Sequence, residues 1–416
     1  MKLSPRSKSY MIPEYSLTGD LLSFLTCNLQ YRYQNRGTLP PSMPIQLWFG
    51  EFIHGVMEES FLKWKNNKDK GLDKRFPWDW KEDIRPIEEM IDLRLRARGL
   101  YPPLAYFCKY QKEDYINKND NKNNKDDDIS SSIGLCKDEN HPHKLLYSAR
   151  AESSINVWGP DLFPLIDSAE VLIKGKRPMP NFDNNKSRSN YYGINGVIDV
   201  ISSLRIDENA DDDNNSIINY LKKDKDFSRI LNSFDSDEYE IIIDYKGMKR
   251  PPLKSHNWKY HKWQLLTYSW LRSKQNDSKP VIAGIIFYLN ELVPSTEDLI
   301  AIKQDIIDGN NDVKITPSEE SRILEWDENE VNYIKLSDNF KKDRSVRTIA
   351  IEEESISTAL KNFDNVVYDI ENSIISETNG TPIKNAWEAK GDKRTCDACD
   401  FKTFCNKSNL NEFKIP

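Results

Sequence analysis

The sequence has no apolar run approaching the ~20 residues that a membrane helix needs; VIAGIIFYL at 281–289 is only long enough for a strand. The first residues, MKLSPRSKSYMIPEY, are basic but lack the apolar centre of a secretory signal peptide. We therefore expect a cytoplasmic protein without a membrane partner. A G-x-x-x-x-G-K-[S/T] phosphate loop is also missing, which excludes an ATP-driven helicase motor in this chain.

Positive charge is not in excess, because 59 Lys and Arg residues are set against 66 Asp and Glu residues, for a net charge of −7. This balance argues against a protein that coats nucleic acid nonspecifically, but it leaves room for a local basic groove. Cysteine is scarce too, with six residues. In a cytoplasmic protein these are expected to be thiols or metal ligands rather than a disulfide framework.

The chain of 416 residues is long enough for two or three average domains or for one large domain with insertions. Two stretches, 112–143 and 205–237, are poor in apolar residues and are predicted to be long loops outside the core. Elsewhere the spacing of apolar residues predicts helices at 18–33, 44–64 and 261–274 and strands at 193–204, 239–247 and 279–290. This order predicts a mixed α/β sheet.

Two of the predicted strands carry an acid among isoleucine and valine, Asp199 in GVIDVI and Asp244 in EIIIDYKG. A lone buried carboxylate costs several kcal/mol, so the two acids are expected to share a hard cation such as Mg²⁺. Lys246 lies two residues after Asp244 and therefore on the same face of the strand. The alternatives are that Asp199 caps a turn and that Asp244 and Lys246 form a solvated ion pair.

Two predicted helices add polar groups. His54 lies on the helix at 44–64, on the same face as Gly50 and Glu58, although a lone helical histidine is commonly a satisfied core or surface residue. Gln264 and Tyr268 are spaced i, i+4 and share one face of the helix at 261–274.

The stretch 246–263 contains no acid and interleaves basic with aromatic residues. Basic groups neutralise phosphates and aromatic faces stack on bases, which is how proteins grip single-stranded nucleic acid. The residues predicted to contact DNA are Lys249, Arg250, Lys254, Trp258, Lys259 and Tyr260.

Three cysteines near the end of the chain, Cys396, Cys399 and Cys405, follow a C-x2-C-x5-C spacing. Three ligands leave one place open in a four-ligand site, and Cys27 is the candidate for it. Zinc and iron–sulfur clusters both use four thiolates, so the spacing does not separate them. Cys108 and Cys136 fall outside the pattern and are interpreted as ordinary thiols.

Taken in order, GEFIH (50–54), GVID (196–199), DYK (244–246) and QLLTY (264–268) resemble the motif series of the RecB-type PD-(D/E)XK nucleases. The resemblance implies phosphodiester hydrolysis with Mg²⁺ or Mn²⁺. It makes His54, Asp199, Asp244 and the carbonyl of Tyr245 metal ligands. Lys246 would position the attacking water and stabilise the transition state, while Gln264 and Tyr268 would orient Lys246 or touch the substrate backbone.

The C-terminal cysteines and the segment LTGDLLSFLTCNLQYRY around Cys27 resemble the iron–sulfur subclass of these nucleases, which includes AddB and the CRISPR-associated adaptation exonucleases. The resemblance implies a structural 4Fe-4S cluster on residues 383–410 completed by Cys27, and it runs from about residue 17 to 410. The chain is about twice the length of the compact CRISPR exonucleases.

The resemblance therefore predicts one restriction-endonuclease-like α/β nuclease domain over 1–416. Its mixed central sheet is flanked by helices, and a four-cysteine cluster joins N- and C-terminal helical segments. The expected activity is that of a DNA exonuclease on single-stranded ends, in DNA repair, recombination or CRISPR adaptation. A helicase or CRISPR adaptation proteins would act in trans. The alternatives are a non-catalytic DNA-binding subunit and a zinc-stapled structural protein.

Overall fold

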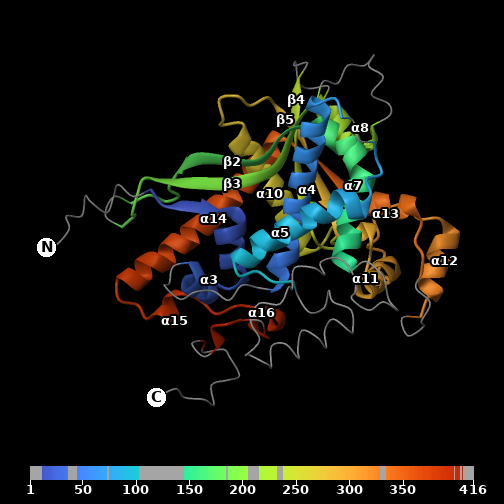
Figure 1. Ribbon diagram of the computed structural model, residues 1–416. Helices are drawn as coiled ribbons and strands as arrows, with labels where there is room; N and C mark the ends of the chain where they lie inside the picture. Colours follow the sequence, from blue (N-terminus) through green and yellow to red (C-terminus); the bar gives the residue numbers. More distant parts are fainter. Residues whose placement is uncertain are drawn as a thin grey trace, which may run out of the picture.

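The computed structural model describes residues 12–35, 45–72, 75–102, 145–183, 186–204, 215–231, 238–327, 334–397, 399–402 and 405 (Figure 1). The predicted insertion at 112–143, Cys108 and Cys136 lie outside the described residues. Across the described ranges, no helix combines the length and the apolar character needed to cross a bilayer.

A six-stranded mixed sheet forms the centre of the fold. Its strands are β1 (Glu14–Ser16), β2 (Ile166–Pro178), β3 (Tyr191–Leu204), β4 (Tyr239–Lys246), β5 (Val281–Tyr288) and β6 (Val346–Ala350). The order is β1-β3-β4-β5-β6, with β2 pairing with β3. The β4–β5 pair is parallel, whereas β2–β3, β3–β4 and β5–β6 are antiparallel. The mixed α/β sheet predicted from the sequence is confirmed.

The long strand β3 has different neighbours along its two edges. It pairs with β2 along nearly its whole length. On the other edge, β1 pairs in parallel with residues 193–195 and β4 pairs with residues 200–204. Within the described chain, residues 196–199 therefore lie on that edge between the end of one partner strand and the start of the next. We call this interval the β3 gap.

Helices cover both faces of the sheet (Figure 1). Side chains of β4 alternate between the faces, as a strand requires, so that Ile241 and Ile243 belong to one core cluster and Ile242 to the other. The first cluster includes residues of α4 (Ile45–Asp69), α5 (Arg85–Ala97) and α7 (Leu146–Leu162). The second includes residues of α10 (His256–Arg272) and α14 (Glu353–Thr378). The sheet is thus the middle of three layers.

The N-terminal helix predicted at 18–33 is divided in the structure. It consists of η1 (Leu17–Leu21), α2 (Leu22–Thr26) and α3 (Asn28–Asn35). Cys27 lies between α2 and α3 with an extended backbone, φ −161° and ψ 113°. The break has the consequence that Cys27 stands at a junction between helices rather than on a continuous helical face.

The two ends of the described chain pack together. The C-terminal part contains α15 (Ile383–Ala386) and α16 (Lys393–Asp397). The ring of Trp387 lies against those of Phe24 and Tyr31, with centroids 6.2 and 6.1 Å apart. The backbone N–H of Leu29 donates to the carbonyl of Glu388 at 3.1 Å. Aromatic packing and a backbone hydrogen bond therefore join the two ends of the described chain.

The prediction of a loop outside the core is wrong for the middle of 205–237. Residues 215–231 form α8 (Ser216–Lys223) and α9 (Lys225–Leu231), and Ile217, Leu221 and Phe227 are buried in the first core cluster. The polar composition of the whole stretch led to the prediction of a loop, although Ile217 and Leu221 have the i, i+4 spacing of a helix. Asn215 is the N-cap of α8, and its side chain accepts from two backbone N–H groups. The flanks, 205–214 and 232–237, lie outside the described residues.

A small helical lobe between β5 and β6 was not predicted. It contains α11 (Thr296–Ile307), α12 (Pro317–Glu325) and α13 (Asp338–Arg344), with an apolar cluster of its own that includes Leu299, Ile323, Trp326 and Phe340. The remaining short helices are η2 (Trp80–Ile84), η5 (Phe163–Leu165) and η7 (Leu289–Leu292).

Candidate functional site

The predicted polar residues meet in one pocket at the β3 gap. Its volume is about 360 Å³. The residues predicted from the sequence that line it are His54, Asp199, Asp244, Lys246, Gln264 and Tyr268. Ser16, Thr18, Leu172, Asn195, Gly196 and Val197 complete the wall. Four separate sequence motifs thus converge on one place in the fold.

Asp244, Lys246 and Gln264 form a closed triangle of polar contacts. The ammonium of Lys246 lies 2.6 Å from Oδ2 of Asp244 and donates to Oε1 of Gln264 at 3.0 Å. The amide nitrogen of Gln264 donates to Oδ1 of Asp244, also at 3.0 Å. Gln264 therefore orients both charged groups at once. The Asp244–Lys246 pair is a largely buried contact rather than a solvated surface pair, since the two side chains are 4% and 17% exposed.

Asp199 and His54 both contact the backbone of Tyr245. Oδ2 of Asp199 accepts the backbone N–H of Tyr245 at 2.7 Å and lies 3.4 Å from Nδ1 of His54. Nε2 of His54 donates to the carbonyl of Tyr245 at 2.7 Å. The backbone of Tyr245 thus joins the two side chains, and the carbonyl predicted as a metal ligand faces the imidazole.

Burial and charge set the protonation states of this site. Burial by itself would lower the pKa of His54, but the carboxylate of Asp199, and to a smaller extent that of Asp244, raises it to about 9. Burial disfavours the ionised form of Asp199, yet the charge and hydrogen bond of His54 keep the pKa of Asp199 below its usual value. Burial raises the pKa of Asp244 despite the nearby Lys246. The imidazole is therefore cationic at neutral pH, and it neutralises Asp199.

This donor set fits a hard divalent cation. Two buried carboxylates and an imidazole line the same pocket, and the imidazole contacts the carbonyl of Tyr245. Oxygen ligands are what Mg²⁺ and Mn²⁺ prefer. The cationic groups of Lys246 and His54 now balance the two carboxylates. His54 would have to lose its proton to ligate a cation, because only neutral imidazole binds a metal.

A carboxylate that the sequence analysis missed lies beside the pocket, on the exposed residue Glu170. A carboxylate oxygen of Glu170 on β2, a nitrogen of His54 and a carboxylate oxygen of Asp199 all lie within 4.8 Å of one another. Burial, followed by the charge of Asp199, raises the pKa of Glu170 to about 7. No motif surrounds Glu170 in the sequence. Only the pairing of β2 with β3 brings it to the site.

The ring of Tyr268 on α10 packs directly against Gly196 of β3. A Cβ atom on Gly196 would lie 2.5 Å from Cε1 of the Tyr268 ring. Glycine is therefore required at this position of β3 because α10 presses an aromatic ring against the strand. The ring in turn forms part of the pocket wall.

The basic stretch divides into exposed and structural residues. Lys249, Lys254 and Lys259 are exposed, as DNA contact would require, and Trp258 and Tyr260 are half-buried. The guanidinium of Arg347 stacks on the ring of Trp258, 4.2 Å from its centroid. One face of that ring is therefore occupied from within the protein.

The prediction of a DNA contact is wrong for Arg250, which is only 6% exposed. Its guanidinium makes a two-pronged contact with Asp312 at 2.8 and 2.7 Å and donates to the carbonyl of Arg344. Its backbone N–H donates to Glu291 at 2.6 Å. Arg250 anchors the segment after β4 to the helical lobe, whose carboxylates could not be placed from the sequence.

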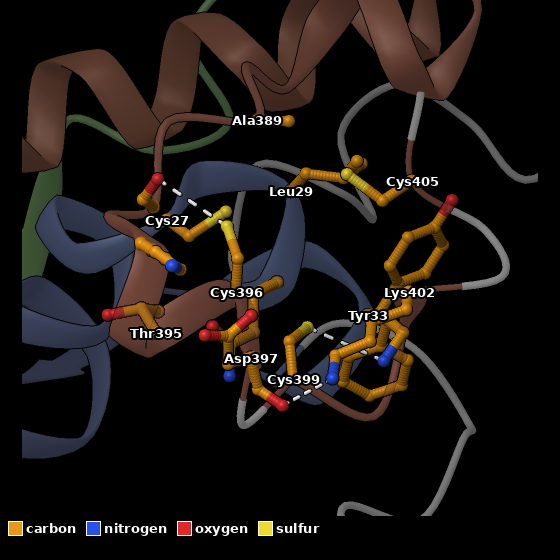
Figure 2. Close-up of a pocket in the computed structure, with 14 residues that line it drawn as sticks. Cys27, Leu29, Tyr33, Ala389, Thr395, Cys396, Asp397, Cys399, Lys402 and Cys405 are labelled. Atoms are coloured by element: carbon orange, nitrogen blue, oxygen red, sulfur yellow. Dashed lines mark hydrogen bonds between the residues drawn. The ribbon is translucent and has the colours of Figure 1, made fainter. Parts of the chain in front are cut away.

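A second cavity, of about 560 Å³, is lined by all four predicted cluster ligands, Cys27, Cys396, Cys399 and Cys405. Figure 2 shows these side chains coming from the α2–α3 junction, from α16 and from the segment after it. All four thiols are free. Burial, together with the negative charge that Cys27 and Cys405 would carry as thiolates, raises the pKa of Cys396 and that of Cys399.

The cavity fits a group that binds four thiolates. A metal ligand is the thiolate rather than the thiol, so a cationic centre would be needed to hold these four cysteines deprotonated together. The rest of the wall is mixed: it includes the apolar Leu29, Ala389 and Phe401 and the charged Lys393, Asp397 and Lys402. Both an iron–sulfur cluster and zinc use such a ligand set.

Comparison with known proteins extends over part of the chain. No curated protein matches it significantly. His54, Asp199 and Cys27 precede the region for which a family match is found. Residues 229–406, which contain Asp244, Lys246, Gln264, Tyr268 and the three C-terminal cysteines, match the model of the PD-(D/E)XK nuclease superfamily.

Proposed function

We propose that the protein is a metal-dependent deoxyribonuclease that hydrolyses phosphodiester bonds at the β3 gap. The observation that carries the proposal is the convergence of Asp199, Asp244, Lys246 and Gln264 on one pocket. Two acids and a lysine, all oriented by hydrogen bonds, have no evident purpose in packing. The superfamily match over residues 229–406, which include Asp244, Lys246 and Gln264, supports the same conclusion.

The residues divide the chemistry among them. Asp199, Asp244, the Tyr245 carbonyl and His54 would hold Mg²⁺ or Mn²⁺, which lowers the pKa of bound water and offsets negative charge on the reacting phosphate. Lys246 faces the same phosphate, where its ammonium orients the attacking water and stabilises the charge that develops in the transition state. Gln264 holds Lys246 at 3.0 Å, so the ammonium is positioned before the substrate arrives. Tyr268 walls the pocket.

The rim of the pocket favours a single-stranded substrate. Leu172 and Val197 are cross-strand partners on β2 and β3, line the pocket and are 60% and 40% exposed. Exposed apolar side chains beside a phosphate site suit the unpaired bases of a single strand, whereas in a duplex the bases are covered by their partners. The exposed Lys249, Lys254 and Lys259 add the positive charge that a DNA backbone requires. We therefore propose exonuclease action on single-stranded ends.

We further propose that the cysteine cavity holds a structural 4Fe-4S cluster. The proposal is supported by the four cysteines that line one cavity and by the resemblance of the cysteine segments to iron–sulfur nucleases. Cluster and nuclease pocket are connected through the N-terminal segment, because Thr18 lines the nuclease pocket and Cys27 the cysteine cavity. Ligation of Cys27 would thus help to hold one wall of the nuclease pocket in place.

The deciding experiment is digestion of end-labelled single- and double-stranded DNA by protein purified without oxygen, with Mg²⁺, Mn²⁺ or EDTA. We expect metal-dependent release of nucleotides from single strands. Asp199→Asn and Asp244→Asn are each expected to abolish it, and the double variant to be no worse than either single one, because both acids serve one site. Binding of DNA without cleavage under every metal condition would refute the nuclease and favour a non-catalytic DNA-binding subunit.

The pathway is a separate proposal. The resemblance to iron–sulfur nucleases suggests DNA repair, recombination or CRISPR adaptation, with a helicase or adaptation proteins acting in trans. Isolation of the intact protein with its bound partners, followed by identification of those partners, tests this point. Recovery of neither class of partner would remove that assignment while leaving the nuclease proposal in place.

A further inference from the structure

The paired strands β2 and β3 continue past the nuclease pocket and away from α4 (Figure 1). Their pairing runs without a shift from Val171 to Pro178. Side chains two residues apart share a face of a strand, and directly paired residues share a face of the sheet. One face of this hairpin, which we call the hairpin face, therefore carries Leu172, Lys174 and Lys176 of β2 and Tyr191, Asn195 and Val197 of β3.

The helices cover the opposite face of the hairpin and leave the hairpin face open. On the covered face, a Cβ atom on Gly175 would lie 2.8 Å from the side chain of Leu271 on α10. On the side of the hairpin face, the first core cluster includes Val200 of β3 but no residue of 191–197. This part of the sheet therefore lacks a covering layer among the described helices.

The hairpin face exposes apolar, aromatic and basic side chains together. Leu172, Tyr191 and Val197 are 60%, 45% and 40% exposed, and Lys174 and Lys176 are exposed as well. Among the described residues, neither ammonium has an ion pair or hydrogen bond, and no ring stacks on that of Tyr191. Such a surface suits a single strand, because aromatic faces stack on bases and ammonium groups neutralise phosphates.

One acid lies at the other edge of this surface. The carboxylate of Glu14 on β1 accepts from the amide of Asn195 at 3.2 Å. It forms no salt bridge with Lys174 or Lys176, because β1 and β2 pair with opposite edges of β3. The two lysines are two residues apart, or about 7 Å along the strand, so they can contact separate phosphate groups.

The hairpin face begins at the pocket itself, since Leu172, Asn195 and Val197 also line the pocket. We propose that the single strand next to the scissile phosphate runs along the hairpin face. Its phosphates lie at Lys174 and Lys176, and one of its bases stacks on Tyr191. The inference rests on the proposed nuclease function and adds to it the path of the substrate. The occupant is single-stranded DNA, because a base that stacks on a protein ring must be free of its neighbours in a duplex.

Equilibrium binding of oligothymidylate in EDTA tests this path without any cleavage. Lys174→Gln and Lys176→Gln are each expected to reduce the slope of log K against log salt by roughly 0.7. Tyr191→Ala is expected to weaken binding about 5–150-fold, the effect of losing one stacked base. Tyr191→Phe keeps the ring and should bind like the wild type.

Lys361→Gln is the matched control. Lys361 is exposed on α14, a helix that contributes to the core cluster on the opposite face of the sheet. The substitution removes the same charge away from the proposed path, so the salt slope and the affinity should match those of the wild type. Near-ultraviolet circular dichroism confirms that each variant is folded.

The possible results separate the path from the nuclease. Salt slopes that stay unchanged in both hairpin lysine variants, or that fall equally in Lys361→Gln, overturn the path and leave the nuclease to its own assay. Tyr191→Ala that binds as tightly as the wild type also overturns it, since no base would then stack on this ring. Protein that shows all the expected binding effects but cleaves no DNA with Mg²⁺ or Mn²⁺ refutes the nuclease and keeps the hairpin face as a binding surface.

Discussion

Replacing Lys246 with methionine tests the centre of the proposed mechanism. Methionine keeps much of the volume of the side chain and removes only the ammonium that lies 2.6 Å from Asp244 and 3.0 Å from Gln264. Loss of one preorganised electrostatic stabiliser typically lowers the rate ~10²–10³-fold, or about 3–4 kcal/mol of transition-state stabilisation. We expect Lys246→Met to lose cleavage of single-stranded DNA by that factor while its affinity for DNA changes little.

The same substitution should lower the stability of the metal-free protein. Removing one partner of a buried ion pair costs about 3–5 kcal/mol. Here Lys246 is 17% exposed and Gln264 continues to donate to Asp244, so we expect a smaller loss, about 2–3 kcal/mol in the free energy of unfolding. The loss should shrink as Mg²⁺ is added, because a cation at Asp244 replaces the missing positive charge.

Denaturant unfolding with and without Mg²⁺, beside the cleavage assay, measures both effects. Lys279→Met is the control, since Lys279 pairs with Glu238 at 2.9 Å at the surface, where both side chains are 36% exposed. Such pairs contribute about 0–1 kcal/mol. A folded Lys246→Met protein that cleaves within tenfold of the wild-type rate would exclude Lys246 from the chemistry. A stability loss that Mg²⁺ does not reduce would argue that no cation binds at Asp244.

Three further predictions follow from the structure. Arg250→Gln should lower the free energy of unfolding by about 3–5 kcal/mol in denaturant titrations and leave the salt dependence of DNA binding unchanged. Lys249→Gln and Lys254→Gln should each reduce the slope of log K against log salt by roughly 0.7 for single strands. The opposite pattern would show that Arg250 contacts DNA. The pKa of His54 is raised from about 6.5 in the unfolded chain to about 9, so its stabilising contribution is complete below pH 6.5 and is lost as the pH rises through 9. Mn²⁺ affinity measured by calorimetry should correspondingly increase over that interval, and His54→Gln should abolish the increase; a pH-independent affinity would argue against His54 as a ligand. Cys27→Ala should lose iron, acid-labile sulfide and the visible absorbance, and it should also have a lower melting temperature and slower cleavage. Alanine at Cys108 or Cys136 should have none of these effects. Full iron content in Cys27→Ala would contradict the four-cysteine site, and stoichiometric zinc without sulfide in the wild type would show a zinc site in place of the cluster.

The sequence by itself determined the elements that follow local rules. Alternation along a strand puts Asp244 and Lys246 on one face, and the i, i+4 spacing of Gln264 and Tyr268 puts these two on one face of a helix. Both relations depend only on the local periodicity of a strand or a helix, and the structure confirms them. The resemblance that the four motifs carry also implied that distant segments meet, and His54 and Asp199 do lie 3.4 Å apart.

Only the tertiary structure decided what depends on partners far along the chain. Lys249 and Arg250 are adjacent and equally basic, yet one is exposed and the other is buried, because Asp312 and Glu291 of a later segment reach only the second. Glu170 has no motif around it and meets Asp199 through strand pairing alone. A carboxylate or guanidinium acquires its role from the charges and the burial around it. Those are set by long-range packing, which the local pattern of a sequence does not record.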